Sequence, residues 1–331
     1  MHRYLQLFWK VILPIALIVA VGWFFYEKLR RPELWAEEVH IRPLWLIPAG
    51  LLYLAAHLVW GRFSITLLRN QGATVSVPTG LRAYFISQFG KYIPGKVWVI
   101  LLRVAMLGNI GISKTAVGIT AFYEALTSMA AGALIGTLLI PFLAPEQQGL
   151  QGYSVLWIAP FAMAPIGLVG LNRFVNRVNR WRRGPHAKQL PRVKLHWVVL
   201  GMLQNSIGWL CMGLSLWLTV EAVIPASNGL TLEKYAHFTS INAIAYVVGF
   251  VALFMPAGAG IRELALQILL AQEFRSEMSD GAAQGLAAVV AILLRLVWTV
   301  AELAMAAILY YFAPSAAKQA VSRQDTVEAV K

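Results

Sequence analysis

The sequence SQFGKYIPGKVWVILLR, residues 87–103, contains the feature that decides the fold. It lies among apolar runs of membrane-spanning length, yet it carries two lysines and an arginine around a Pro94-Gly95 break. Proline removes a backbone donor and ends a helix, and glycine lets the chain reverse direction. Non-helical backbone at membrane depth is tolerated only where it is buried in protein or lines a wet cavity. Residues 80–107 are therefore predicted to form a re-entrant hairpin whose tip is half of a functional site.

The composition indicates an integral membrane protein. Of 331 residues, 59% are hydrophobic and only 13% are charged. These values argue against soluble, disordered and nucleic-acid-binding classes. The net charge of +13 is interpreted by position, because Lys and Arg collect on cytoplasmic loops. We expect a multi-pass protein of the bacterial cytoplasmic (inner) membrane with no nucleic-acid partner.

Further apolar runs are long enough to cross a bilayer, which takes about 20 residues. The predicted spans are residues 8–26, 44–68, 116–142, 153–172, 196–220 and 284–312. A second stretch, 235–272, is interrupted by MPAGAG and is predicted to form another re-entrant hairpin. The predicted fold is an all-α polytopic membrane protein with about six full spans and two re-entrant helical hairpins.

The loops predict how the chain is oriented. Residues 173–194 are rich in Lys and Arg, whereas 143–152 and 221–232 contain neither. The basic loop is therefore assigned to the cytoplasm and the other two to the outside. Continuing this assignment along the chain places the N-terminus and the 313–331 tail in the cytoplasm. The first hairpin then enters from the inside and the second from the outside.

Both halves of the chain show the order span, span, hairpin, span. The first membrane repeat is residues 1–142 and the second is residues 153–312. Because their hairpins enter from opposite sides, the halves are predicted to form an inverted repeat, an architecture typical of transporters. The alternative is that proline and glycine merely kink ordinary spans, which membrane helices tolerate.

Charged and helix-breaking residues of the hairpins and later spans make up the candidate binding site. They are Lys91, Pro94, Gly95, Lys96, Arg103, Glu124, Pro256, Gly258, Gly260, Arg262, Glu263 and Arg295. Cations outnumber carboxylates, and helix N-termini after the breaks add amide donors, so the site favours an anion such as a phosphate headgroup. Alternatively, Glu124 with Arg295, and Arg262 with a neighbouring carboxylate, are ion pairs that hold the bundle together.

Two other polar residues lie in predicted spans. Glu302 follows Arg295 by seven residues and so shares its helix face. His57 is interpreted as a packed, hydrogen-bonded histidine rather than a proton carrier. The sequence shows no metal-ligand cluster, phosphate loop or nucleophile motif, so neither a metal, a cofactor nor enzymatic activity is predicted.

At these residues the chain resembles the flippase-like family named for the lysylphosphatidylglycerol synthase transmembrane region. The similar pieces are SQFGKYIPGKVW followed by Arg103, the GIS lead into a helix carrying Glu124, the segment MPAGAGIRELAL, and Arg295 in the last span. In the MPAGAG segment, Ala257 and Ala259 stand where the family has glycines. The resemblance implies a lipid-translocating membrane domain. The 18 residues of 314–331 are too few for the soluble transferase domain found in multiple peptide resistance factors, so aminoacyl transfer is not expected on this chain.

The predicted function is a flippase that moves an anionic, phosphate-bearing lipid or a polyprenyl-linked lipid between leaflets without nucleotide hydrolysis. The alternative is a non-transporting subunit that docks a glycosyltransferase or lipid synthase through the basic loop 173–194. A homo-oligomer is compatible with either role. An enzyme embedded in the membrane is less favoured, because no nucleophile is paired with a base.

Overall fold

The computed structural model describes Trp23 and residues 41–92, 97–139, 164–184, 194–224, 229–251 and 260–312. Every regular element within these ranges is helical. Candidate membrane spans there are Pro43–Asn70, Lys114–Leu138, Leu195–Val223 and Asp280–Phe312, which are long and apolar enough to cross a bilayer. The prediction of an all-α membrane protein is thus confirmed. The predicted span 8–26 lies outside the described residues, apart from Trp23, as does most of 153–172.

Long helices alternate with pairs of shorter ones along the chain. In the first half, α3 (Leu46–Asn70) is followed by α4 (Val77–Gln88), the 3-10 helix η4 (Phe89–Tyr92), α5 (Val97–Gly108) and α6 (Lys114–Leu138). In the second half, α11 (Leu195–Val223) is followed by α12 (Leu232–Val251), α13 (Ile261–Phe274) and α14 (Asp280–Phe312). The predicted turning points, at 93–96 and 252–259, lie outside the described residues.

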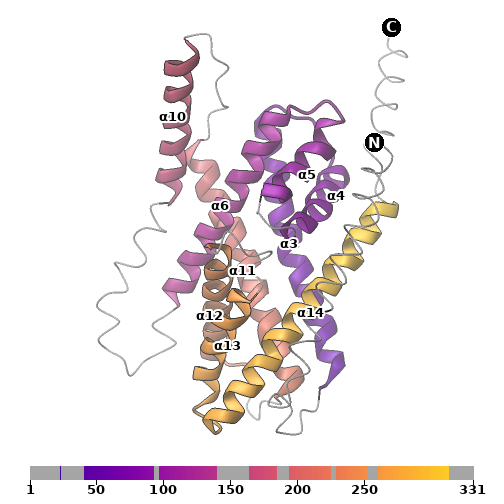
Figure 1. Ribbon diagram of the computed structural model, residues 1–331, viewed down its shortest axis with the longest axis vertical. Coiled ribbons are helices and arrows are strands. Elements are labelled where there is room, and N and C mark those ends of the chain that lie inside the picture. The colour runs from indigo at the N-terminus through magenta and orange to yellow at the C-terminus, as the bar shows by residue number, and fades with distance from the viewer. Residues whose placement is uncertain are drawn as a thin grey trace.

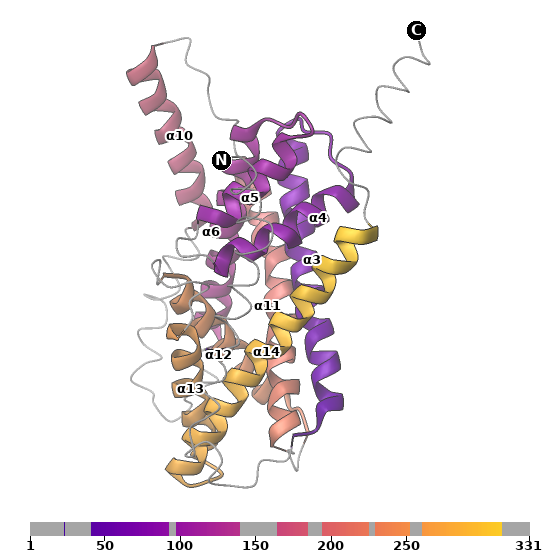
Figure 2. The ribbon, with the colours of Figure 1, turned by 45° about the vertical axis from the view of Figure 1, so that its right-hand side comes forward.

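The short helices lie toward opposite ends of the bundle. In Figures 1 and 2, α4 and α5 lie at the end where α3 finishes and α6 starts. In the same views, α12 and α13 lie toward the other end, where α11 finishes and α14 starts. Helix α5 packs against α4 and α6, and α13 packs against α12 and α14. The two short pairs therefore have corresponding neighbours in the two halves.

Local sequence signals explain where two of the short helices, α4 and α13, begin. The hydroxyl of Ser76 accepts a hydrogen bond from the amide of Thr79 and so caps α4. Gly260 directly precedes α13, and its φ of 85° suits a residue without a side chain. The Glu263 carboxylate accepts a hydrogen bond from the Gly260 amide at 2.7 Å. This contact fixes the start of the helix that carries Arg262.

Helix α11 packs closely on α3 and α6 through glycines. A Cβ atom on Gly208 would lie 2.2 Å from Trp60 Nε1, and one on Gly132 would lie 2.5 Å from the Trp209 ring. Trp60 donates from Nε1 to the main-chain oxygen of Asn205 at 3.1 Å. Small residues at helix contacts allow such close approach in membranes, where packing rather than solvent exclusion holds helices together.

Helix α10 (Ala164–Arg183) corrects one prediction. The basic segment 173–194 was expected to be a loop, but it stays helical through Arg183. Asn172 and Asn176, four residues apart, are buried, while the arginines at 173, 177 and 180 are exposed. This polar pattern has helical spacing, so the fall in hydrophobicity does not end the helix. In Figures 1 and 2, α10 reaches beyond the adjacent ends of α5 and α6.

Candidate functional site

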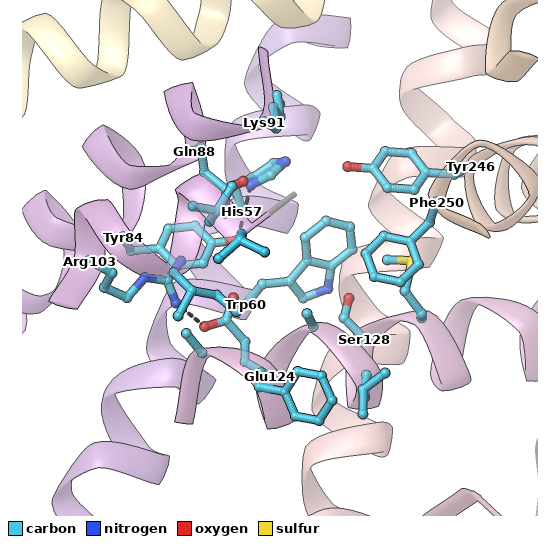
Figure 3. A pocket seen from close by; sticks show the side chains of 18 of the residues that line it. His57, Trp60, Tyr84, Gln88, Lys91, Arg103, Glu124, Ser128, Tyr246 and Phe250 are labelled. Atoms are coloured by element: carbon cyan, nitrogen blue, oxygen red, sulfur yellow. Dashed lines mark hydrogen bonds and ion pairs between the residues drawn. The ribbon is translucent and has the colours of Figure 1, made fainter. Parts of the chain in front are cut away.

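A cavity of about 310 Å³ lies among α3, α4, η4, α5, α6, α12 and α13 (Figure 3). Polar groups occupy part of its wall: His57, Tyr84, Gln88, Lys91, Arg103, Glu124, Ser128, Tyr246 and Arg262. The rest of the lining is mostly aromatic or aliphatic and includes Trp60, Phe122, Met129 and Phe250. A mostly apolar concavity with a few convergent polar groups is the usual form of a small-molecule site, and its volume is at the low end of the usual range.

Arg103 of α5 is held by several side chains at one side of the cavity. Its guanidinium forms an ion pair with the Glu124 carboxylate of α6. It also donates to the hydroxyl oxygens of Ser64 at 3.1 Å and Ser87 at 3.0 Å. The guanidinium carbon lies 4.9 Å from the centroid of the Tyr84 ring, within the range of a cation–π contact. These contacts join α3, α4, α5 and α6.

Lys91 of η4 forms an ion pair with Glu302 of α14. The same carboxylate accepts hydrogen bonds from the hydroxyls of Tyr53 and, at 3.0 Å, Tyr92. The guanidinium carbon of Arg295 lies 5.5 Å from the centroid of the Tyr92 ring. Arg295 and Glu302 therefore meet the same tyrosine, as their spacing of seven predicts. This cluster links the first half of the chain to the last helix.

Two arginines share the carboxylate of Glu263. Its Oε1 lies 3.5 Å from Nη2 of Arg262 and 3.4 Å from Nη1 of Arg295. The guanidinium carbon of Arg262 lies 5.2 Å from the ring centroid of Tyr246 and 5.0 Å from that of Trp298. The two guanidinium groups and the one carboxylate together carry a net positive charge.

Gly249 of α12 allows α13 to bring Arg262 against the cavity. A Cβ atom at position 249 would lie 2.7 Å from Cβ and 3.3 Å from Cα of Arg262. Real Cβ atoms do not approach neighbours this closely, so a larger residue would push α13 away. Both Gly249 and Arg262 line the cavity.

Four of the predicted site residues line the same cavity: Lys91, Arg103, Glu124 and Arg262. Gly260, Glu263 and Arg295 lie behind Arg262 and are not part of the lining. The remaining predicted residues lie outside the described ranges: Pro94, Gly95, Lys96, Pro256 and Gly258.

The ion-pair alternative was wrong in one of its pairings. Glu124 pairs with Arg103, which the adjacent helix α5 supplies, and not with Arg295. Arg295 instead contacts Glu263. The other predicted pairing, Arg262 with a neighbouring carboxylate, corresponds to the contact with Glu263. The ion-pair and cavity interpretations are therefore compatible, because the paired residues line the cavity or lie next to its wall.

Metal-binding chemistry has no counterpart in the described part of the chain. Within those residues no group of three or more His, Cys, Asp and Glu side chains is arranged to hold a metal ion. The groups that line the cavity are cations, one carboxylate, an amide, hydroxyls, an imidazole and aromatic rings.

Comparison with known proteins identifies the family. The model described as "Lysylphosphatidylglycerol synthase TM region" matches residues 11–309, most of the chain. The chain belongs to this family. The resemblance predicted from the sequence is thus confirmed. The comparison with curated proteins gave no match.

For this member of the lysylphosphatidylglycerol synthase TM region family, sequence reasoning missed much of the cavity wall. Tyr84, Tyr246 and Trp60 lie in apolar helices, where aromatic residues give no distinctive signal. The partners of Arg103 could have been sought, because an arginine in an apolar helix requires hydrogen-bond acceptors. One such acceptor, Ser87, lies within the stretch 87–103, but it was not selected.

Proposed function

We propose that this protein moves a lipid with an anionic, phosphate-bearing headgroup between the two leaflets of the membrane. The observation that supports this most directly is the cavity whose wall contains Lys91, Arg103 and Arg262 but only one carboxylate, Glu124. A phosphate entering it would gain charge-assisted hydrogen bonds, which are about twice as strong as neutral ones. The apolar part of the wall suits the adjoining lipid. Family membership indicates a membrane domain involved in lipid handling.

We further propose that the two halves form an inverted repeat that alternates access to the cavity. Each half has two short helices between long ones, and the two short pairs lie toward opposite ends of the bundle (Figures 1 and 2). Transporters with this arrangement bind their substrate where the repeats meet. The lining of the cavity supports this proposal, because it contains residues of α4, η4 and α5 together with residues of α12 and α13.

The end of the bundle where α3 finishes is assigned to the cytoplasm in this proposal. Arg69 lies in the last turn of α3, Lys114 begins α6, and Lys194 directly precedes α11 at the same end. Basic residues concentrate on the cytoplasmic side of bacterial membrane proteins. With this assignment, α4 and α5 enter from the cytoplasm, and α12 and α13 enter from outside.

Replacement of Arg262 by alanine is expected to slow lipid movement by about tenfold or more, the equivalent of losing one hydrogen bond between charged groups. The variant should still fold, because Arg295 remains beside Glu263 and keeps that carboxylate compensated. The measurement uses purified protein in vesicles containing phosphatidylglycerol with a fluorescent label on one acyl chain. A reductant that does not cross the membrane then reports how fast the inner-leaflet label becomes accessible.

Arg275→Ala is the matched control, since Arg275 follows the same helix but is exposed and pairs with the exposed Asp280. It is expected to transport at the original rate. Equal rates for Arg262→Ala and the unaltered protein would show that Arg262 is not part of the binding site. A rate for the unaltered protein no faster than that of protein-free vesicles would contradict transport and favour the docking role.

A further inference from the structure

Two buried polar atoms in the cavity wall lack a hydrogen-bond partner in the described structure. They are Nε2 of His57 and Oγ of Ser128, in side chains of residues that are 2% and 5% exposed. Buried polar groups in folded proteins are nearly always hydrogen-bonded, so each exception calls for a physical reason. Because both residues line the cavity, a bound molecule can supply the missing partners.

His57 is held in a fixed orientation. Its Nδ1 lies 3.1 Å from the Tyr84 hydroxyl, and its ring centroid lies 4.4 Å from that of Tyr53 and 5.0 Å from that of Trp60. The opposite nitrogen, Nε2, is the atom without a partner. In Figure 3 the His57 ring and the Tyr246 hydroxyl point into the cavity toward each other. An imidazole fixed in this way can exchange a hydrogen bond with a hydroxyl group of a ligand.

Ser128 stands one helical turn after Glu124 on α6, so the two share a face. Its main-chain oxygen accepts a hydrogen bond from Trp209 Nε1 at 2.9 Å, which anchors this turn while the hydroxyl stays unpaired. Figure 3 shows the hydroxyl directed inward between Trp60 and Phe250. Thr120, on the same helix, also has an unpaired hydroxyl but does not line the cavity.

The charges around the cavity disfavour a ligand that carries ammonium groups. Three cations and one carboxylate line the wall, and the carboxylate, Glu124, is engaged by Arg103. The carboxylates next to the wall are engaged as well, Glu302 by Lys91 and Glu263 by Arg262 and Arg295. Aromatic rings can bind an ammonium group through cation–π contacts. Here, however, the ring of Tyr84 lies against Arg103 and that of Tyr246 against Arg262. An ammonium group would therefore lie near like charges, and two of the aromatic rings in the wall already contact arginines.

We infer that the cavity binds a phosphate-linked headgroup with free hydroxyl groups and no ammonium group, and that His57 and Ser128 contact those hydroxyls. A glycerol or a sugar alcohol linked to phosphate has this chemistry. Lysylated phosphatidylglycerol does not, because lysine adds two ammonium groups. The inference rests on the proposed function, since it specifies the headgroup for the same cavity.

Lipid binding to the purified protein in detergent tests the inference, with bound lipid counted by native mass spectrometry. The probes are phosphatidylglycerol, phosphatidylinositol, phosphatidic acid and lysylated phosphatidylglycerol. We expect the two hydroxyl-bearing anionic lipids to bind about tenfold more tightly than phosphatidic acid, as two additional hydrogen bonds would give. The lysylated lipid is expected to bind more weakly than phosphatidylglycerol. A difference between phosphatidylglycerol and phosphatidylinositol would identify glycerol or the sugar alcohol as the preferred source of the hydroxyls.

Ser128→Ala removes a single oxygen and is expected to weaken phosphatidylglycerol binding about three- to tenfold while leaving phosphatidic acid unchanged. His57→Phe, which keeps an aromatic ring, is expected to do the same. Thr120→Val is the matched control and should change neither lipid. If phosphatidylglycerol and phosphatidic acid bind equally and Ser128→Ala affects neither, the inference is wrong while the proposed function stands. If no anionic lipid binds, both are wrong.

Discussion

Glu124→Ala is expected to destabilise the protein by about 3–5 kcal/mol, the cost of removing one partner of a buried ion pair. The substitution leaves the Arg103 guanidinium, in a residue only 2% exposed, without its carboxylate. Ser64 and Ser87 would still accept hydrogen bonds from it, but two neutral hydroxyls cannot balance a full charge at this depth. The midpoint of thermal unfolding in a fixed detergent measures the effect.

The double variant Arg103→Met with Glu124→Met tests whether the stability lost in Glu124→Ala comes from the unpaired charge or from lost packing. Replacing both partners of a buried pair by apolar residues of similar size is often neutral or stabilising, so most of the lost stability should return. The double variant should nevertheless transport poorly, because it removes a cation and the carboxylate from the cavity wall. Glu277→Ala, which removes an exposed carboxylate paired with the half-buried Lys234, is the control and should cost less than about 1 kcal/mol. A double variant as unstable as Glu124→Ala would show that the uncompensated charge is not the cause.

Gly90→Ala is expected to cost about 3 kcal/mol, at the upper end for overpacking. A Cβ atom on Gly90 would lie 2.4 Å from the main-chain nitrogen of Val99 and 2.5 Å from the main-chain carbon of Trp98. Main-chain atoms cannot rotate away as a side-chain end can, so η4 and α5 would have to separate. Because Lys91 is the next residue, its ion pair with Glu302 would shift as well. We expect a lower unfolding midpoint together with loss of lipid movement.

Gly118→Ala is the matched control for this prediction. Gly118 lies in α6 and faces α5, but a Cβ there would meet Val104 at 3.7 Å and Ile100 at 3.8 Å, which are ordinary contacts. Alanine in place of glycine inside a helix is favourable by about 1 kcal/mol, so stability should hold or rise. Equal stability of the Gly90 and Gly118 variants would contradict the close packing of η4 on α5.

The class of fold was predictable because it depends on composition and on the length of apolar runs. Four long helices match ranges that hydropathy alone predicted, since a bilayer sets how many apolar residues a span needs. The continuation of α10 to Arg183 was not predictable in this way. Hydropathy reports where a chain leaves the membrane, whereas a helix ends only where its backbone hydrogen bonds do.

The residues of the site were easier to predict than their partners. A charge in an apolar run is conspicuous, so Lys91, Arg103 and Arg262 could be selected from the sequence as groups at a buried polar site. The choice of carboxylate for each cation depends on how helices pack. Arg103 meets Glu124, 21 residues away, whereas Lys91 meets a glutamate 211 residues away. Neither separation is encoded in a local pattern.

The contacts of Glu302 also determine the order in which the protein can be completed during synthesis. The carboxylate lies 211 residues after Lys91 and 249 residues after Tyr53 in the chain. At about 5–20 residues per second, the ribosome takes roughly 10–40 seconds to make the sequence between Lys91 and Glu302. During that interval Lys91 has no access to its carboxylate, so η4 cannot reach its final environment. The first half therefore reaches its final set of contacts only after the last helix is inserted.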